Sequence, residues 1–243
     1  MRVYVIKSKG YRANKETGEV IEKAVCEDSV MWCVDDGKNA QIAAGCVCDG
    51  VGSLRDSVKA AEYTANKLKE FIKRKSITGL SDSDIIRAIE DKILEIHNSK
   101  YWDSEENYRS ATTLVFIVFD KKSEKYFIAN VGDSRCYYAD IKNKKLSLLT
   151  EDQEDEVGRL TSAINKNQKE EIEIDITDGE IKKGDVFLIA SDGLFKKMND
   201  KELMERLVEK NSHGYKNVLA NIEKELRTRG EKDDITALIM EIQ

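Results

Sequence analysis

Carboxylates beside apolar segments are the residues of this sequence best suited to chemistry. They lie at the ends of strand-like runs, each next to a residue suited to a turn: Glu27, Asp28, Asp49, Asp192, Asp233 and Asp234. A carboxylate at the end of a buried strand is costly unless it is paired, hydrogen-bonded or coordinated. Several converging carboxylates would hold a hard divalent cation, because Mg²⁺ and Mn²⁺ prefer oxygen ligands. The sequence therefore favours a divalent-metal site.

The Asp-Gly steps at 49–50 and 192–193 also have an ordinary structural interpretation. A single Asp-Gly at the end of a strand is more often a turn than a ligand. Here the same arrangement, an apolar run followed by Asp-Gly, occurs twice, and the repetition favours a metal site. Two ions bridged by one carboxylate would activate a water and clamp the oxygens of a phosphoryl group during in-line attack.

Sequence signals for other chemistries are weak. Neither of the nucleotide-binding loops G-x-x-x-x-G-K-[ST] and G-x-G-x-x-G occurs. His97 and His213 lie on expected helices or at their ends, without a neighbouring nucleophile, so we expect packing or surface roles for both. Cys46 and Cys48 lack two further zinc ligands. We expect them to pack on one face of a strand, and all five cysteines to be reduced.

The composition limits the class of protein. The 243 residues are 40% hydrophobic and 35% charged, enough for a substantial core. The formal net charge is -6 and the lysines are scattered among acids, so the basic surface of a nucleic-acid-binding protein is missing. No apolar run approaches ~20 residues and the N-terminus lacks the features of a signal peptide. We expect a cytoplasmic protein without nucleic-acid or membrane partners.

The chain alternates between blocks of strands and blocks of helices. Short apolar segments predict nine strands, at 2–6, 30–34, 42–48, 112–119, 125–131, 135–139, 145–149, 186–190 and 235–241. Apolar residues at helical spacing predict helices over 54–74, 82–99, 200–209 and 215–228. This clustering favours an α+β layered domain over repeated βαβ units. No repeat or linker divides the chain, so we expect one domain over 1–243, with a surface insertion in the polar stretch 150–182.

Six motifs match one known family in order. They are "CDGVG", "SATTLVFIVF", "YFIANVGDSRCYY", "LLTEDQ", "GDVFLIASDGLFKKMND" and "DDITALIMEI". Together they resemble the motifs of the metal-dependent serine/threonine protein phosphatases of the type-2C (PPM) family, especially its bacterial members. The matching region spans roughly residues 20 to 243, and "ANVGDSR" with "LIASDGL" is highly specific.

The resemblance implies a four-layer α-β-β-α sandwich, in which helix pairs flank two antiparallel sheets and a two-metal site lies in a cleft at one end. It implies hydrolysis of phosphoserine and phosphothreonine by a hydroxide that bridges two Mn²⁺ or Mg²⁺ ions, with a third, weaker metal site. Asp49 would bridge the metals and Gly50 would bind through its carbonyl. The resemblance assigns the remaining metal ligands to Asp192, Asp233, Glu27 and Asp28.

The resemblance also implies partners and an alternative. The partners are a phosphorylated protein substrate and a serine/threonine kinase acting on it, and we expect a monomer. The alternative is a phosphatase-like regulatory or binding module with weak or no catalysis. Lys23, Ser53 and a short flap over 153–180 motivate this alternative. The presence of every primary metal carboxylate argues against it.

Several residues depart from the family pattern. Lys23 stands where the family has a phosphate-binding arginine, and lysine lacks the bidentate fork; Arg12 from a shifted loop is the other candidate. Val51 replaces a histidine, Ser53 a glycine and Asp234 an asparagine.

Two further features of the pattern concern the third metal and the hairpin at 132–135. No family-like carboxylate for the third metal lies beside Asn107 and Arg109, which leaves Asp103, Glu105 and Glu106 as substitutes. In the hairpin "GDSR", Asp133 and Arg135 are expected to satisfy buried polar groups.

Overall fold

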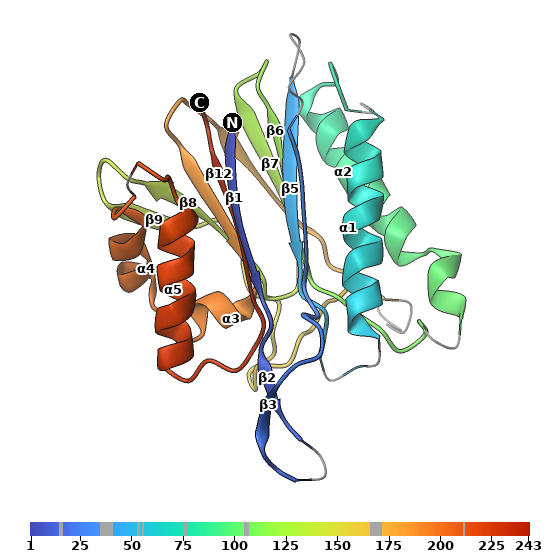
Figure 1. Ribbon diagram of the computed structural model, residues 1–243. Helices are drawn as coiled ribbons and strands as arrows, with labels where there is room; N and C mark the ends of the chain where they lie inside the picture. The colour runs from blue at the N-terminus through green and yellow to red at the C-terminus, as the bar shows by residue number, and fades with distance from the viewer. Residues whose placement is uncertain are drawn as a thin grey trace.

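Two antiparallel β-sheets packed face to face form the centre of the molecule (Figure 1). The computed structural model describes all residues except 15–16, 35–40, 53, 55, 75–76, 105–106, 166–171 and 211. In the first sheet the strands follow the order β1 (Arg2–Ser8), β12 (Ile235–Glu241), β11 (Val186–Ala190), β8 (Arg135–Asp140) and β9 (Lys145–Leu148). In the second the order is β10 (Asp175–Glu180), β7 (Lys125–Val131), β6 (Leu114–Asp120), β5 (Ile42–Cys48) and β4 (Ser29–Val34).

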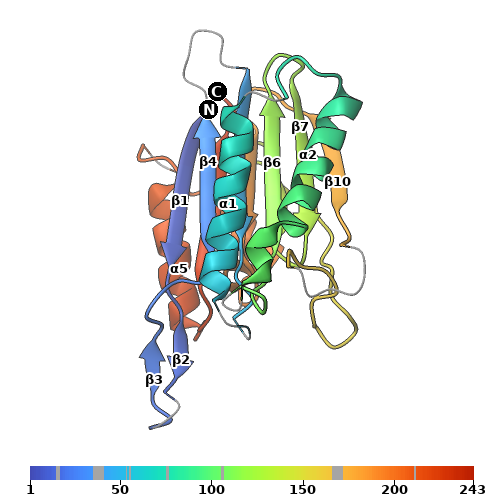
Figure 2. The same ribbon diagram turned by 90° about the vertical axis from the view of Figure 1, so that its right-hand side faces the viewer.

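Helices cover the outer face of each sheet. Helices α1 (Ser57–Lys73) and α2 (Asp82–His97) pack on the second sheet, followed by a short 3₁₀ helix, η1 (Lys100–Asp103) (Figure 2). Helices α3 (Asp192–Phe195), α4 (Asp200–Leu207) and α5 (Lys216–Thr228) pack on the first. The arrangement is the α-β-β-α sandwich that the family resemblance implies, and it agrees with the α+β layered domain that the apolar pattern predicts. Within the described residues, no helix combines the length and apolar character required to cross a bilayer.

The core consists of three apolar layers, and strand β5 shows why. Every residue of β5 is buried because both of its faces are covered. Ala43 and Val47 face the opposite sheet, whereas Cys46 and Cys48 face helices α1 and α2. This confirms the predicted shared face of the two cysteines, and all five cysteines of the chain are free thiols. The sheet-to-sheet layer includes Phe187, whose ring meets that of Phe119 edge-on at 5.1 Å.

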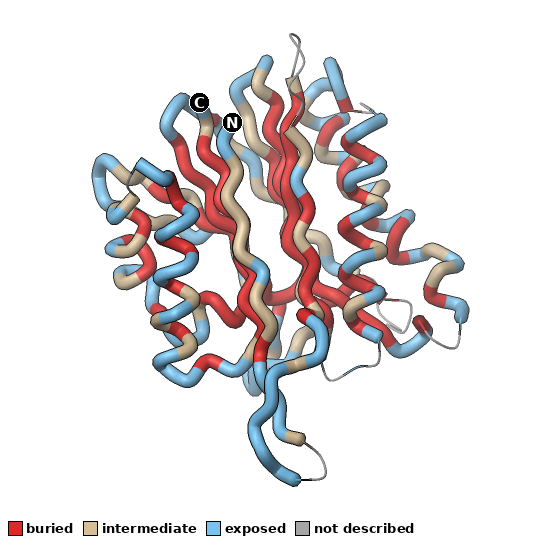
Figure 3. Tube along the Cα trace, viewed as in Figure 1, coloured by how far each residue is buried: buried red, intermediate tan, exposed pale blue. Residues whose placement is uncertain are grey.

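The nine predicted strands and four predicted helices are all present, but three strands and the short helices α3 and η1 were not expected. Strands β2 (Tyr11–Ala13) and β3 (Val20–Glu22) form a hairpin that projects beyond the sandwich, and every residue of both is exposed (Figure 3). Such short strands show no apolar alternation. Strand β10 lies within the expected flap of 153–180 and pairs with β7 at the edge of the sheet. Edge strands are commonly polar, so the polar composition of this segment does not distinguish strand β10 from a surface insertion.

Candidate metal centre at one end of the sandwich

The predicted carboxylates meet at one end of the two sheets. Because neighbouring strands run antiparallel, the residues after β5 and before β4 lie at the same edge, as do those after β11 and before β12. A cleft of about 780 Å³ opens there. Its lining includes seven of the residues that the sequence offers for the site: Arg12, Lys23, Glu27, Asp49, Gly50, Asp192 and Asp233. Asp28 is buried at the base of β4, next to Glu27.

Backbone contacts fix the turn that carries Asp49. The Asp49 carbonyl accepts hydrogen bonds from the Thr113 amide (2.8 Å) and the Thr112 hydroxyl (2.9 Å). The Asp49 amide donates to the Thr113 hydroxyl (3.1 Å). At Gly50 a side chain is excluded, because a Cβ would lie 2.5 Å from the Glu27 carbonyl oxygen. The segment "ATT" thus anchors the Asp-Gly step, and glycine lets the backbone of the neighbouring strand approach closely.

The carboxylate of Asp49 lies at the centre of the acidic cluster. Burial raises its pKa well above the usual range, and the negative charges of Asp28 and Asp192 raise it further. Asp133 and Asp233 add smaller contributions of the same sign. Repulsion among these carboxylates favours either protonation of Asp49 or the binding of a cation.

Asp28 is almost completely buried, with 1% of its surface exposed. The Ser191 hydroxyl donates a hydrogen bond to its Oδ2 (2.8 Å), while its Oδ1 has no hydrogen-bond partner among the described residues. Burial raises the pKa of Asp28 to about 7, although a hydrogen bond with Thr236 opposes the shift. A buried acceptor without a donor is costly, and a cation would satisfy it.

Asp192 opens helix α3 and has the same property. Its Oδ1 is buried and unpartnered in the described part of the chain, while Lys196, one turn later, binds Oδ2. Burial raises the pKa of Asp192, and the charge of Asp233 raises it further. The following Gly193 is required by space, since a Cβ there would lie 1.9 Å from the carbonyl oxygen of Asp234.

Asp234 ties three segments of the site together. Its Oδ1 accepts from the Gly10 amide (2.6 Å) and its Oδ2 from the Glu27 amide (2.7 Å). Lys23 Nζ lies 3.2 Å from the same Oδ2. The side chain is 2% exposed, so this carboxylate is a buried hydrogen-bonded link between the segments that carry Gly10 and Glu27.

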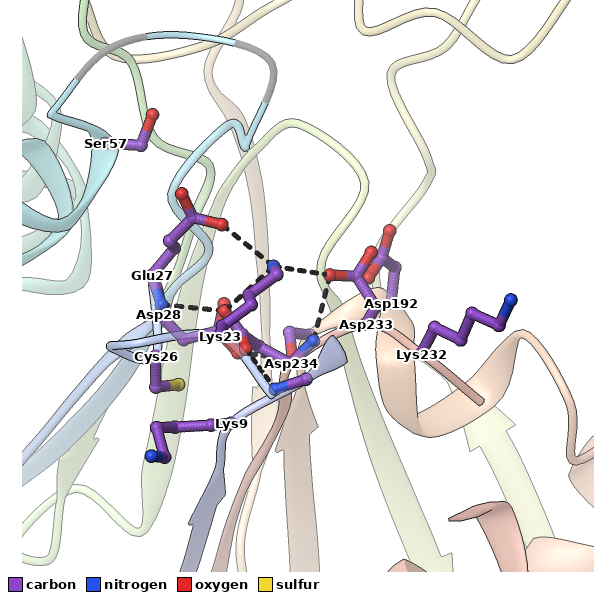
Figure 4. Close-up of polar contacts among 12 residues, drawn as sticks. Lys9, Lys23, Cys26, Glu27, Asp28, Ser57, Asp192, Lys232, Asp233 and Asp234 are labelled. Atoms are coloured by element: carbon purple, nitrogen blue, oxygen red, sulfur yellow. Dashed lines mark hydrogen bonds and ion pairs between the residues drawn. The ribbon is translucent and has the colours of Figure 1, made fainter. Parts of the chain in front are cut away.

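Lys23 lines the cleft and lies among three carboxylates (Figure 4). Its Nζ lies 2.8 Å from Glu27 Oε2 and 3.2 Å from Asp233 Oδ1, in addition to its contact with Asp234. Burial alone would lower the pKa of Lys23, but the hydrogen bond to Glu27 and the charges of Asp233 and Asp234 outweigh it and raise the pKa. Arg12, on strand β2, also lines the cleft, so both predicted phosphate-binding candidates lie at the site.

Asp133 is a site residue whose position the sequence did not indicate. The sequence predicts that Asp133 satisfies buried polar groups, but the structure places it in the lining of the cleft. Burial raises its pKa to about 7, and the charges of Asp192 and Glu154 add to the shift. The available signal was its position: like Asp49, Asp133 lies just beyond an apolar strand and next to a glycine. The architectural role is confirmed for Arg135, which pairs with Asp152 at 2.7 Å and stacks on Phe195.

The other sequence candidates that the structure describes do not line the cleft. In the described chain the lining of the cleft does not include Asp103, Asn107 or Arg109, and Glu105, Glu106 and Ser53 fall outside the described residues. The N-terminal part of the expected flap does border the cleft, through Glu154, Gly158, Arg159 and Leu160.

The donor set suits hard divalent cations. It consists of carboxylate oxygens, including the buried unpartnered Oδ1 atoms of Asp28 and Asp192. One thiol is near, because ligand atoms of Cys26, Asp28 and Asp234 lie within 4.8 Å of one another. Burial raises the pKa of Cys26 to about 12, so it is a protonated thiol and a poor ligand at neutral pH.

Comparison with known proteins agrees with this geometry. Residues 17–232 match the family model described as protein phosphatase 2C. The fold is similar to that of a serine/threonine phosphatase from S. agalactiae (TM-score 0.79, 17% identity, covering 100% of this chain and 99% of that one). It is also similar to Stp1 from Staphylococcus aureus (0.77, 16%, 100% and 95%) and PstP/Ppp from Mycobacterium tuberculosis (0.71, 19%, 100% and 98%). A search of curated proteins finds no match.

Proposed function

Because the chain belongs to the protein phosphatase 2C family and is therefore a metal-dependent serine/threonine protein phosphatase, we propose that the carboxylate cleft is its catalytic centre. One observation carries this proposal. Two buried carboxylate oxygens, Asp28 Oδ1 and Asp192 Oδ1, lack a partner among the described residues and flank the half-buried Asp49. Burial of such groups as carboxylates is costly unless they are protonated or a cation is bound.

The residues that would hold two Mn²⁺ or Mg²⁺ ions are those at the floor and walls of the cleft: Asp49, the Gly50 carbonyl, Asp192, Asp233, Glu27 and Asp28. Asp133, whose pKa responds to the charge of Asp192, extends the set toward a third position. When bound, the ions would supply an activated water and neutralise the charge on the phosphoryl oxygens.

The chain's own residues prepare the cleft for a phosphate monoester. Arg12, on the projecting hairpin, and Lys23 provide positive charge at the cleft for the phosphoryl group. Hydrogen bonds from Thr112 and Thr113 fix the backbone of Asp49, so its carboxylate is held in place before substrate binds. Val51 lines the cleft in place of an imidazole, so proton transfer to the leaving group falls to another group.

The proposal also covers the substrates, the kinase, the oligomeric state and the cellular location. We propose that the substrates are phosphorylated cytoplasmic proteins, that a serine/threonine kinase acts on them, and that the protein is a monomer. Five free thiols support a reducing compartment. The kinase and the monomeric state rest on the resemblance to the family. No contact in the described chain favours the alternative of an inactive binding module.

The test is hydrolysis of a phosphothreonine peptide by the metal-stripped protein, measured before and after addition of Mn²⁺ or Mg²⁺. Phosphate release is expected only with a divalent cation, and a phosphotyrosine peptide serves as the specificity control. Equal release in EDTA would contradict the proposal.

A further inference from the structure

Two lysine ammonium groups contact the carboxylates of the proposed metal centre. Lys23 Nζ lies within 3.2 Å of oxygens of Glu27, Asp233 and Asp234 (Figure 4). Lys196 Nζ binds Asp192 Oδ2 and lies 4.0 Å from Asp233 Oδ2. Asp233 therefore has one lysine at each of its two oxygens.

The two lysines come from different parts of the chain, and both line the cleft. Lys23 lies between the projecting hairpin and β4, whereas Lys196 follows the short helix α3. Lys23 is 16% exposed and makes three ion pairs, which distinguishes it from a solvated surface lysine. Lys196 is half exposed, so water can solvate its ammonium group when a divalent cation takes its place at the carboxylates.

These ammonium groups and a divalent cation require the same oxygens. A Mg²⁺ or Mn²⁺ ion binds carboxylate oxygen at about 2.1 Å, closer than an ammonium nitrogen can approach. An ion at that distance from Asp233 would lie a few ångströms from both ammonium groups. Repulsion between like charges at such a separation is strong in a partly buried site.

We propose that Lys23 and Lys196 are tethered cations that compete with divalent metal for the carboxylates of Asp192, Asp233 and Glu27, and so set the metal affinity of the centre. This inference rests on the proposed metal site. The lysines neutralise part of the acidic cluster and stabilise the fold by themselves. A lysine displaced by metal stays at the cleft by its aliphatic chain, where its charge is available to phosphoryl oxygens.

The test is calorimetric titration of Mn²⁺ into metal-free protein at pH 7.5. The variants Lys23→Met and Lys196→Met remove the charge and keep an aliphatic chain, and Lys197→Met, an exposed neighbour of Lys196, is the matched control. Lys23→Met and Lys196→Met are expected to tighten the dissociation constant by about tenfold or more. The double variant is expected to bind more tightly still, and Lys197→Met to bind as the wild type does.

A second readout is the thermal midpoint in EDTA. The midpoint should be lower in Lys23→Met and Lys196→Met than in the wild type, because the carboxylates lose their internal cations. Addition of Mn²⁺ should raise the midpoint of these variants by more than it raises that of the wild type. Lys196→Met keeps the test decisive if Lys23→Met does not fold. Unchanged or weaker Mn²⁺ binding in a folded Lys196→Met would overturn the inference. If the variants bind Mn²⁺ and the wild type does not, the inference is supported. If neither the wild type nor any variant binds Mn²⁺, the proposed metal site is contradicted as well.

Discussion

At the scale of single residues, the site depends on how each carboxylate is satisfied. Asp49, Asp192 and Asp233 were found in the sequence because each adjoins an apolar strand beside a turn residue. Asp133 has the same placement but lies within a motif interpreted as a hairpin. Lys196 gave no signal, because a lysine directly after a short helix resembles any solvated lysine. Both roles depend on contacts made in the folded structure, which for Lys196 are those with Asp192 and Asp233.

The junction at Asp234 gives a stability prediction. Asp234→Ala would leave the buried Gly10 and Glu27 amides without their acceptor and Lys23 without one of its three carboxylates. We expect a loss of about 2–4 kcal/mol in the free energy of unfolding. Urea denaturation in EDTA measures it. Asp234→Asn, which keeps one acceptor oxygen, should lose less, and an unchanged midpoint in Asp234→Ala would contradict the role.

At the scale of elements, the long strands and helices were predictable because their apolar periodicity is strong. The hairpin β2–β3 and strand β10 were not, because exposed or edge strands carry no such pattern. Helix α3, at four residues, is too short to show periodicity. Yet α3 positions Asp192, so a small element missed from the sequence fixes a main residue of the site.

Gly193 tests the packing of α3 against the β12 end of the site. In Gly193→Ala the new Cβ would overlap the Asp234 carbonyl oxygen, so α3 must shift and take Asp192 with it. We expect a loss of about 1–3 kcal/mol in stability, together with weaker Mn²⁺ binding.

The matched control for Gly193→Ala is Gly184→Ala. Gly184 has a positive φ of 95°, and a Cβ added there would have no atom within 4 Å, so this variant carries backbone strain without overlap. It should keep the wild-type affinity for Mn²⁺. Equal affinities in the two variants would show that α3 does not depend on this close contact.

At the scale of the whole molecule, the acidic cluster lies at one end of the sandwich and both chain termini lie toward the other (Figure 1). The register of β1 against β12 pairs Arg2 with Glu241 and Ser8 with Ile235, which places Met1 far from the cleft. Because several carboxylates are gathered at the cleft, their mutual repulsion lowers the stability of the molecule when no metal is bound.

This charge predicts how stability varies with pH in EDTA. The pKa of Asp28 rises from 3.8 to about 7 on folding, so between these values the folded state holds a proton that the unfolded state has released. Stability therefore falls as pH rises from about 4 to about 7, by at most on the order of 4 kcal/mol for this group. Unfolding in urea at several pH values measures the slope. Asp28→Asn should flatten it, and a slope identical to wild type would contradict the assignment.

The most direct test of the central claim is the rate at which Asp49→Asn hydrolyses a phosphothreonine peptide in saturating Mn²⁺. Asparagine preserves the size of the side chain but removes the charge that would bridge two cations. The rate should fall by at least about 100-fold while circular dichroism shows a folded protein. The control is Asp140→Asn. Asp140 lies at the end of β8 away from the cleft, so this variant should retain the wild-type rate. A folded Asp49→Asn protein with wild-type turnover would contradict the metal centre.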